Sequence, residues 1–298
     1  MIMNWFAKIM DLPLVRKSNG LRSFLIAGWL GWQIESNWTR PFLFAIYSIV
    51  RPLAGVMILV IIYSVITDGA LQEPIFAYIY LGNALYILVG QVITGVSWAV
   101  IDDREHYQTL RQLHTTPMNG YYYLMGRGFA KLTVAGIAVV IIIAFGKVFF
   151  HLPVEMAAIH WPLFLVSTIL GIISLASLGL LLGSLTMMMA RHFWSLGEAV
   201  GGALFLFSGA IFPLDTLPAA LRPIGFIFPV TYWLEAARRA LLGPQAVIFP
   251  TFAEFSNSSL LLILLAFSIF LVFFSSKFYS WSLHRAKEKG LIDMESSY

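Results

Sequence analysis

Few side chains in this sequence could do chemistry, and none of them forms a catalytic signature. The six histidines are scattered, not placed at the spacing of metal ligands. The sequence has no phosphate-binding P-loop, no His-Glu-x-x-His zinc motif and no Gly-x-Ser-x-Gly nucleophile turn. It also contains no cysteine, which excludes a disulfide framework and a thiolate site. We therefore expect no catalytic residue, metal or cofactor in this chain.

The longest polar run, residues 101–117, lies between two apolar segments and carries both charge signs. Acidic residues near its start suit the positive end of a helix, so we predict a short helix here. Leu110 and Leu113 would give this helix a small apolar face, while Arg104 and Glu105 could pair with a partner protein. A solvated helix without a partner fits the same pattern.

Two of the apolar segments carry polar or aromatic side chains at helical spacing. Polar groups in such segments usually face a bundle interior or an aqueous pathway. The candidate pathway residues are Asn83, Gln91, Thr94, Glu198, Phe205 and Phe212. These polar groups could equally join helices together, with nearby glycines allowing close packing. Glu198 could also simply reach the edge of the membrane.

The composition indicates that the elements holding these residues lie in a membrane. Of 298 residues, 59% are hydrophobic and only 11% are charged, whereas a soluble domain averages about 25% charged residues. Several apolar runs approach the length of about 20 residues that a spanning helix needs. We predict an all-α membrane protein with six transmembrane helices, at residues 42–66, 75–100, 128–150, 162–190, 194–212 and 258–276.

Two further segments are predicted to be helical without crossing the membrane. Residues 21–36 place apolar side chains and tryptophans on one helical face, as an interfacial amphipathic helix does; a helix packed on a protein partner is the alternative. Residues 213–257 are too apolar for a soluble loop and are broken by prolines, so we expect re-entrant helices. The expected domains are a cytosolic N-terminal segment, a membrane domain and a cytosolic tail, at residues 1–40, 41–276 and 277–298.

Arg51 and Pro52 lie inside the first predicted span. A charge in that position costs about 2.5–3.5 kcal/mol on insertion scales, and a proline removes one backbone hydrogen bond. The span could begin near Pro52 instead. We favour an Arg51 side chain that extends to the cytosolic headgroups.

The distribution of positive charge predicts the orientation. Most of the nineteen Lys and Arg residues fall in residues 1–40, 101–131, 191–193 and 277–298, on one side of the predicted topology. Because cytosolic loops carry the excess of Lys and Arg, both termini and the 101–117 segment are expected in the cytosol.

Three motifs, in chain order, resemble those of the ABC-2 family of exporter permeases. The coupling-helix motif is matched by Asp103, Arg104, Glu105, Thr109, Leu110, Leu113 and Pro117. The family's usual pattern is Arg-Glu-x-Gly-Thr, whereas this sequence has one more residue before the threonine and lacks the glycine. The exit of span five is matched by Gly209-x-x-Phe-Pro213 with Leu217-Pro218. The re-entrant helix is matched by Pro229-x-Thr-Tyr232-x-x-Glu235-x-x-Arg238.

The resemblance extends over nearly the whole chain and implies a permease without its own ATPase. Two copies would pair with two cytosolic ABC ATPase subunits, which bind ATP and Mg, and the coupling helix would sit in a cleft of the ATPase. We expect ATP-driven export of an amphipathic or hydrophobic substrate, a drug-like molecule or lipid, along a homodimer interface in the cell membrane. Membrane lipids are expected partners, and nucleic acid is not.

Three alternatives stay open on sequence alone. Within the transporter class, the substrate could be a polysaccharide or a lipid-linked glycan. A membrane-embedded enzyme using Glu198, Glu235 or a histidine would act without a partner. A structural scaffold would tolerate alanine at Arg104 or Glu105.

Overall fold

The computed structural model describes residues 15, 17–37, 41–189 and 194–291. The first part of the expected N-terminal segment, residues 191–193 on the expected cytosolic side, and the end of the tail lie outside the described residues. No strand occurs in the described ranges. The prediction of an all-helical chain is confirmed for this part of the protein.

Five helices are long and apolar enough to cross a membrane, since each exceeds the roughly 20 residues that a core of about 30 Å requires. They are α4 (Pro41–Ile66), α5 (Pro74–Ile101), α7 (Gly120–Phe150), α8 (Trp161–Met188) and α13 (Asn257–Glu288). The first four predicted spans and the sixth lie on these helices. The chain is therefore a multi-pass membrane protein.

The fifth predicted span is shorter than expected. Helix α9 covers Trp194–Phe207, 14 residues, which corresponds to about 21 Å of helix. It ends before residue 212 because Gly209 takes a left-handed backbone conformation, with φ of 73°, and Pro213 follows, which cannot donate a helical hydrogen bond. The described residues thus contain five full-length candidate spans and one shorter apolar helix.

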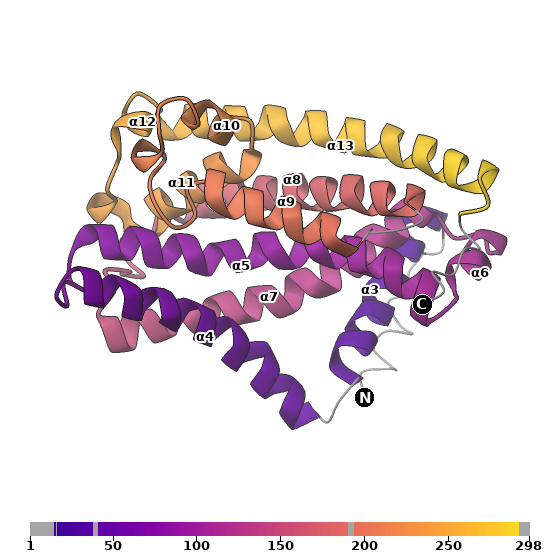
Figure 1. The fold of residues 1–298 in the computed structure, drawn as a ribbon, viewed down its shortest axis with the longest axis horizontal. Helices are drawn as coiled ribbons and strands as arrows, with labels where there is room; N and C mark the ends of the chain where they lie inside the picture. Colours follow the sequence, from indigo (N-terminus) through magenta and orange to yellow (C-terminus); the bar gives the residue numbers. More distant parts are fainter. Residues whose placement is uncertain (1–14, 16, 38–40, 190–193, 292–298) are drawn as a thin grey trace.

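Helix α5 forms the centre of the bundle (Figure 1). It packs against α7, α8, α9 and α4, and most of its side chains are buried. Two glycines of α8, Gly179 and Gly183, allow this close approach, because a Cβ on either would come within 3.4 Å of α5 atoms. Helix α13 lies along the far side of α8. At these two positions glycine allows close helix packing, which is one of the two roles that the sequence left open for glycine.

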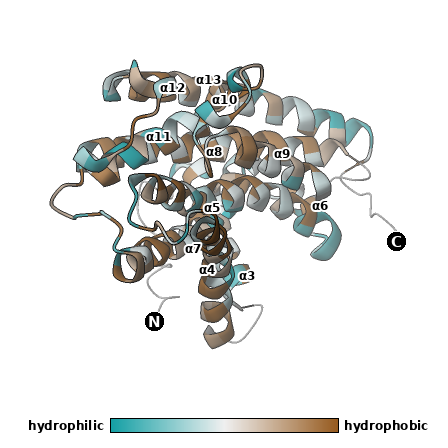
Figure 2. Ribbon diagram, turned by 60° about the vertical axis from the view of Figure 1, so that its left-hand side comes forward, coloured by the Kyte–Doolittle hydropathy of each residue, from teal (hydrophilic) through white to brown (hydrophobic). Residues whose placement is uncertain are grey.

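Helix α4 stands at the edge of the bundle. Among its described side chains only Val56 and Val60 are buried. The rest of the helix is apolar, and Figure 2 shows this hydrophobic colour along α4, in contrast to the hydrophilic colour of α6 (Leu110–Thr115) and of the last turns of α13. A helix with this much exposed apolar surface needs lipid or another protein beside it.

Helix α3 (Asn19–Asn37) packs across α7 through its small residues. Ser23, Ala27 and Gly31 are buried, and a Cβ added at Gly31 would lie 2.8 Å from the Cβ of Ala130. The bulky face predicted from the sequence, which includes Leu21 and Trp32, stays exposed or half-buried. The predicted helix exists, and the face that packs on the bundle is the opposite one. The exposed bulky face agrees with a position at the membrane interface.

The 213–257 region folds into short helices around one buried helix. This helix, α11 (Pro229–Leu242), has all of its residues buried against α8, α13 and α5. The short helices α10 (Arg222–Phe226) and α12 (Pro250–Ala253) cover it at the end of the molecule opposite to α6 (Figure 1). Each of these helices has a proline in its first turn. Proline is tolerated there because the first N–H groups of a helix make no intrahelical hydrogen bond.

Candidate functional site

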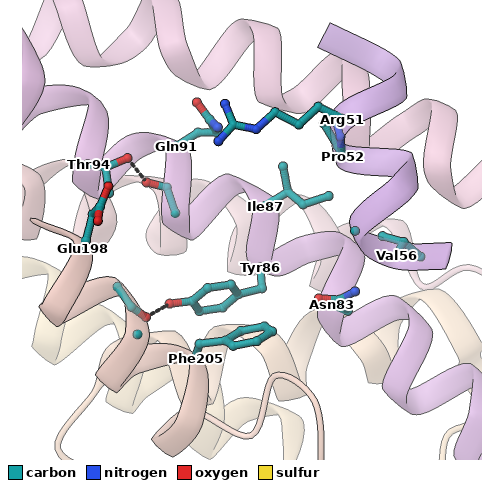
Figure 3. A pocket seen from close by; sticks show the side chains of 14 residues that line it. Arg51, Pro52, Val56, Asn83, Tyr86, Ile87, Gln91, Thr94, Glu198 and Phe205 are labelled. Carbon is teal, nitrogen blue, oxygen red and sulfur yellow. Dashed lines mark hydrogen bonds between the residues drawn. The ribbon is translucent and has the colours of Figure 1, made fainter. Parts of the chain in front are cut away.

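An open cleft of about 520 Å³ lies between α4, α5 and α9 (Figure 3). Five of the six predicted pathway residues line it: Asn83, Gln91, Thr94, Glu198 and Phe205. On α5 the polar residues are separated by multiples of about one helical turn, and the two residues of α9 are two turns apart, so each set shares a helix face. The structure brings the two faces together across one space.

Phe212 is not part of the cleft. It packs with the aromatic and aliphatic cluster around Leu214 and Tyr232, near the start of α13. The expectation assumed one helix through residue 212. Because the chain turns at Gly209, Phe212 points into a different part of the protein.

Sequence reasoning missed two important side chains of the cleft. Tyr86 donates a hydrogen bond from its hydroxyl to the carbonyl of Gly201, and its ring lies 4.8 Å from that of Phe205, between centroids. This contact attaches α9 to α5 and orients Phe205. Arg51 enters the cleft from α4, and its position inside an apolar segment was the signal that could have identified it.

The cleft has a polar and an apolar part (Figure 3). Gln91 lies beside the Arg51 guanidinium, and Glu198 lies near Thr94. Val56, Ile87 and Phe205 line the rest. The hydroxyl of Thr94 already donates to the carbonyl of Gly90, at 2.6 Å. The amides of Asn83 and Gln91 and the two charged groups are the other polar side chains of the lining. This lining can accommodate a molecule with a polar head and an apolar body.

The polar run 101–117 is not one helix. A π-helical turn, Asp102–His106, extends α5, and α6 follows after a bend at Gln108, whose φ of 51° is left-handed. The additional residue in the coupling motif falls in this bend. A left-handed conformation is uncommon for a residue other than glycine, and it separates the two short helices.

The start of this segment is bound within the protein. Asp103 is buried, and its carboxylate accepts hydrogen bonds from Arg127, at 2.8 Å, and from the hydroxyl of Tyr123, at 2.9 Å. Arg104 is also buried and donates to the carbonyl of Met189 at 3.1 Å and to Glu105 at 2.9 Å. Arg104 therefore makes contacts inside the chain, and its pairing with a partner protein stays a prediction.

The other residues of the coupling motif divide into buried and exposed ones. Leu110 is buried, and Leu113 is half-buried against the cluster that contains Tyr279 and Met187. The apolar face of α6 therefore points into the molecule. The backbone N–H of Thr109 donates to the Asp103 carbonyl at 2.8 Å. Among the residues of the segment whose side chains are described, the exposed ones are His106, Tyr107, Gln108, Gln112, Thr115, Thr116 and Pro117.

The residues of the re-entrant motif hold α11 in place. Pro229 begins the helix, and Tyr232 donates to the Phe226 carbonyl at 3.0 Å. Arg238 donates to the carbonyls of Gly209 and Ala210, both at 2.8 Å, and lies 3.7 Å from the centroid of the Tyr78 ring. These contacts fix the bend that ends α9.

Glu235 is paired rather than available for acid–base chemistry. It accepts a hydrogen bond from Arg239 at 2.8 Å, and both side chains are buried. Among the described residues, no three His, Asp or Glu side chains gather in a way that could hold a metal ion. The hypothesis of a membrane-embedded enzyme needs an acid–base group that is available to a substrate. Glu235 is not such a group, because it is buried and paired with Arg239.

The family model described as ABC-2 type transporter matches residues 25–242. The match runs from α3 to the last residue of α11 and includes all three motifs. No curated protein matches the chain.

Proposed function

This chain belongs to the ABC-2 type transporter family, and we propose that it is the membrane permease subunit of an ATP-driven exporter. Permeases of this family are not enzymes themselves and generally pair with an ATPase subunit. The observation that carries the proposal is the cleft between α4, α5 and α9, which is lined by polar and aromatic side chains and opens at the surface. Its amphipathic lining supports an amphipathic or hydrophobic substrate.

The substrate path is proposed to form between two copies of the chain. Helix α4 is exposed over most of its length, and α9 exposes residues such as Glu198, Gly202 and Leu206. A second copy placed against these helices would cover the cleft and convert it into a closed path. Gly201 and Gly202 have no atom within 4 Å of an added Cβ, so on α9 these glycines leave space instead of allowing close packing.

ATP and Mg would be bound by two copies of a separate cytosolic ATPase. We propose that the exposed residues around α6 form the docking surface. Helix α3, α6 and the last turns of α13 lie at one end of the molecule (Figure 1), which supports a shared cytosolic side for the termini and the docking surface. Co-purification of the tagged chain from its source organism tests this, because an ATPase with a Walker motif should accompany it. Its absence would contradict the proposal.

The docking surface can be tested with Gln112→Arg. Gln112 is exposed on α6, and a bulky charge there should obstruct docking while leaving the fold unchanged. We expect substrate-stimulated ATP hydrolysis of the complex to fall about fivefold or more, since disturbing an interface position commonly costs about 1 kcal/mol or more. Gln245→Arg, an exposed glutamine at the opposite end, is the matched control. Equal ATPase activity in both variants would remove α6 from the docking surface.

The pathway can be tested with Phe205→Ala and Gln91→Ala, which should change the range of substrates that stimulate ATP hydrolysis. Phe205 lines the cleft and Phe212 does not, so Phe212→Ala is a control of the same chemistry. We expect Phe212→Ala to lower stability without changing the substrate range. If Phe205→Ala leaves transport of every tested compound unchanged, this phenylalanine serves packing alone.

A further inference from the structure

Arg51 lies at the junction of two clefts. The first is the cleft between α4, α5 and α9. The second, of about 320 Å³, lies on the other side of the same residues and is lined by α3, α4, α5 and α7. Arg51, Pro52, Ile87 and Gln91 line both.

Within the described residues, the charge of Arg51 has no counterion. The carboxylate that lines the second cleft, Glu35, forms an ion pair with Lys131. Glu198, which lines the first cleft, forms no ion pair with Arg51 or with another described residue. The guanidinium therefore keeps its full hydrogen-bonding capacity, with donors arranged in a planar fork that matches the oxygens of an anion.

The charge of Arg51 favours an anionic ligand in the first cleft. A guanidinium in a protein does not lose its proton, so the positive charge of Arg51 is permanent. Arg51 lies eleven residues into an apolar helix of 26 residues, about 15 Å from its start, and such a charge is costly without an anionic partner.

We propose that Arg51 and Gln91 select substrates that carry an anionic head, a carboxylate, sulfate or phosphate, on an apolar body. This inference rests on the proposed transport function and specifies its substrate class. The head would bind the guanidinium and the Gln91 amide, as their neighbouring positions in Figure 3 allow. The apolar body would lie along Val56, Ile87 and Phe205.

The test is binding of three probes to the purified permease in nanodiscs, measured by isothermal titration calorimetry against empty nanodiscs. Octyl phosphate, octylphosphocholine and octyltrimethylammonium share one chain and differ in charge. We expect octyl phosphate to bind at least about tenfold more tightly than octyltrimethylammonium, because one charge-assisted hydrogen bond can supply a difference in affinity of that size. Arg51→Gln should abolish this preference, and Arg51→Lys should keep part of it. Arg285→Gln, an exposed arginine on α13, should bind like the unmodified protein.

The outcomes separate the alternatives. Equal binding of all probes, or an octyl phosphate preference that survives in Arg51→Gln, would overturn the proposal. Tightest binding of octylphosphocholine, lost in both Arg51→Gln and Glu198→Gln, would also overturn it in favour of a zwitterionic head. An unchanged elution profile of Arg51→Gln excludes misfolding as the cause. Because binding to the isolated permease requires no ATPase, a failure here is distinguishable from a failure of the transport function.

Discussion

Asp103→Asn is expected to lower the free energy of unfolding by about 3 kcal/mol. The substitution removes the negative charge that compensates Arg127, and both side chains are almost fully buried. Breaking a buried ion pair from one side costs about 3–5 kcal/mol, because the remaining charge is left without its partner. We expect the lower end of that range, since the Asp102 carboxylate lies 4.0 Å from Arg127 and compensates part of the charge. Titration with SDS in mixed micelles measures the change.

The neighbouring aspartate provides the control. The side chain of Asp102 is 27% exposed, and exposed ion pairs contribute about 0–1 kcal/mol. Asp102→Asn should therefore have a small effect. A double variant, Asp103→Leu with Arg127→Met, should be more stable than Asp103→Asn alone, because it removes both buried charges. If Asp103→Asn is as mild as Asp102→Asn, the buried pair does not connect the polar segment to α7.

Gly82→Ala is expected to destabilise the protein by about 1–3 kcal/mol, the usual cost of overpacking a filled core. A Cβ at Gly82 would overlap the Arg238 guanidinium and the carbonyl oxygen of Ala210. The backbone oxygen cannot move aside without shifting the bend after α9. The arginine would have to leave the two carbonyls to which it donates. Thermal unfolding in detergent, followed by circular dichroism, should show a lower midpoint.

Gly136→Ala is the matched control for this clash. Gly136 lies within α7, and no atom stands within 4 Å of an added Cβ. Alanine should stabilise the helix there by about 0.5–1 kcal/mol, because glycine loses more conformational freedom on folding. The two variants should thus shift the midpoint in opposite directions. A shift of the same sign in both would show that Arg238 does not lie against Gly82.

The sequence by itself determined the helices and much of the cleft. The spans at α4, α5, α7, α8 and α13 follow from apolar length, which is a local property of the chain. The arc of Asn83, Gln91 and Thr94 follows from helical periodicity, and the structure places all three on one wall. Such features require no knowledge of distant residues, because the backbone geometry of a helix repeats every 3.6 residues.

Only the tertiary structure decided what these helices face. A polar run looks solvated in the sequence, yet Asp103 and Arg104 are buried in the structure. Their partners, Arg127 and the Met189 carbonyl, are 24 and 85 residues away in the sequence and are brought to them by the fold. Phe212 left the expected pathway because Gly209 turns the chain there, where Arg238 of α11 binds the carbonyl of Gly209. Arg51 lines two clefts because α3, α5, α7 and α9 pack around this part of α4. Each outcome depends on contacts between distant segments, which local periodicity does not encode.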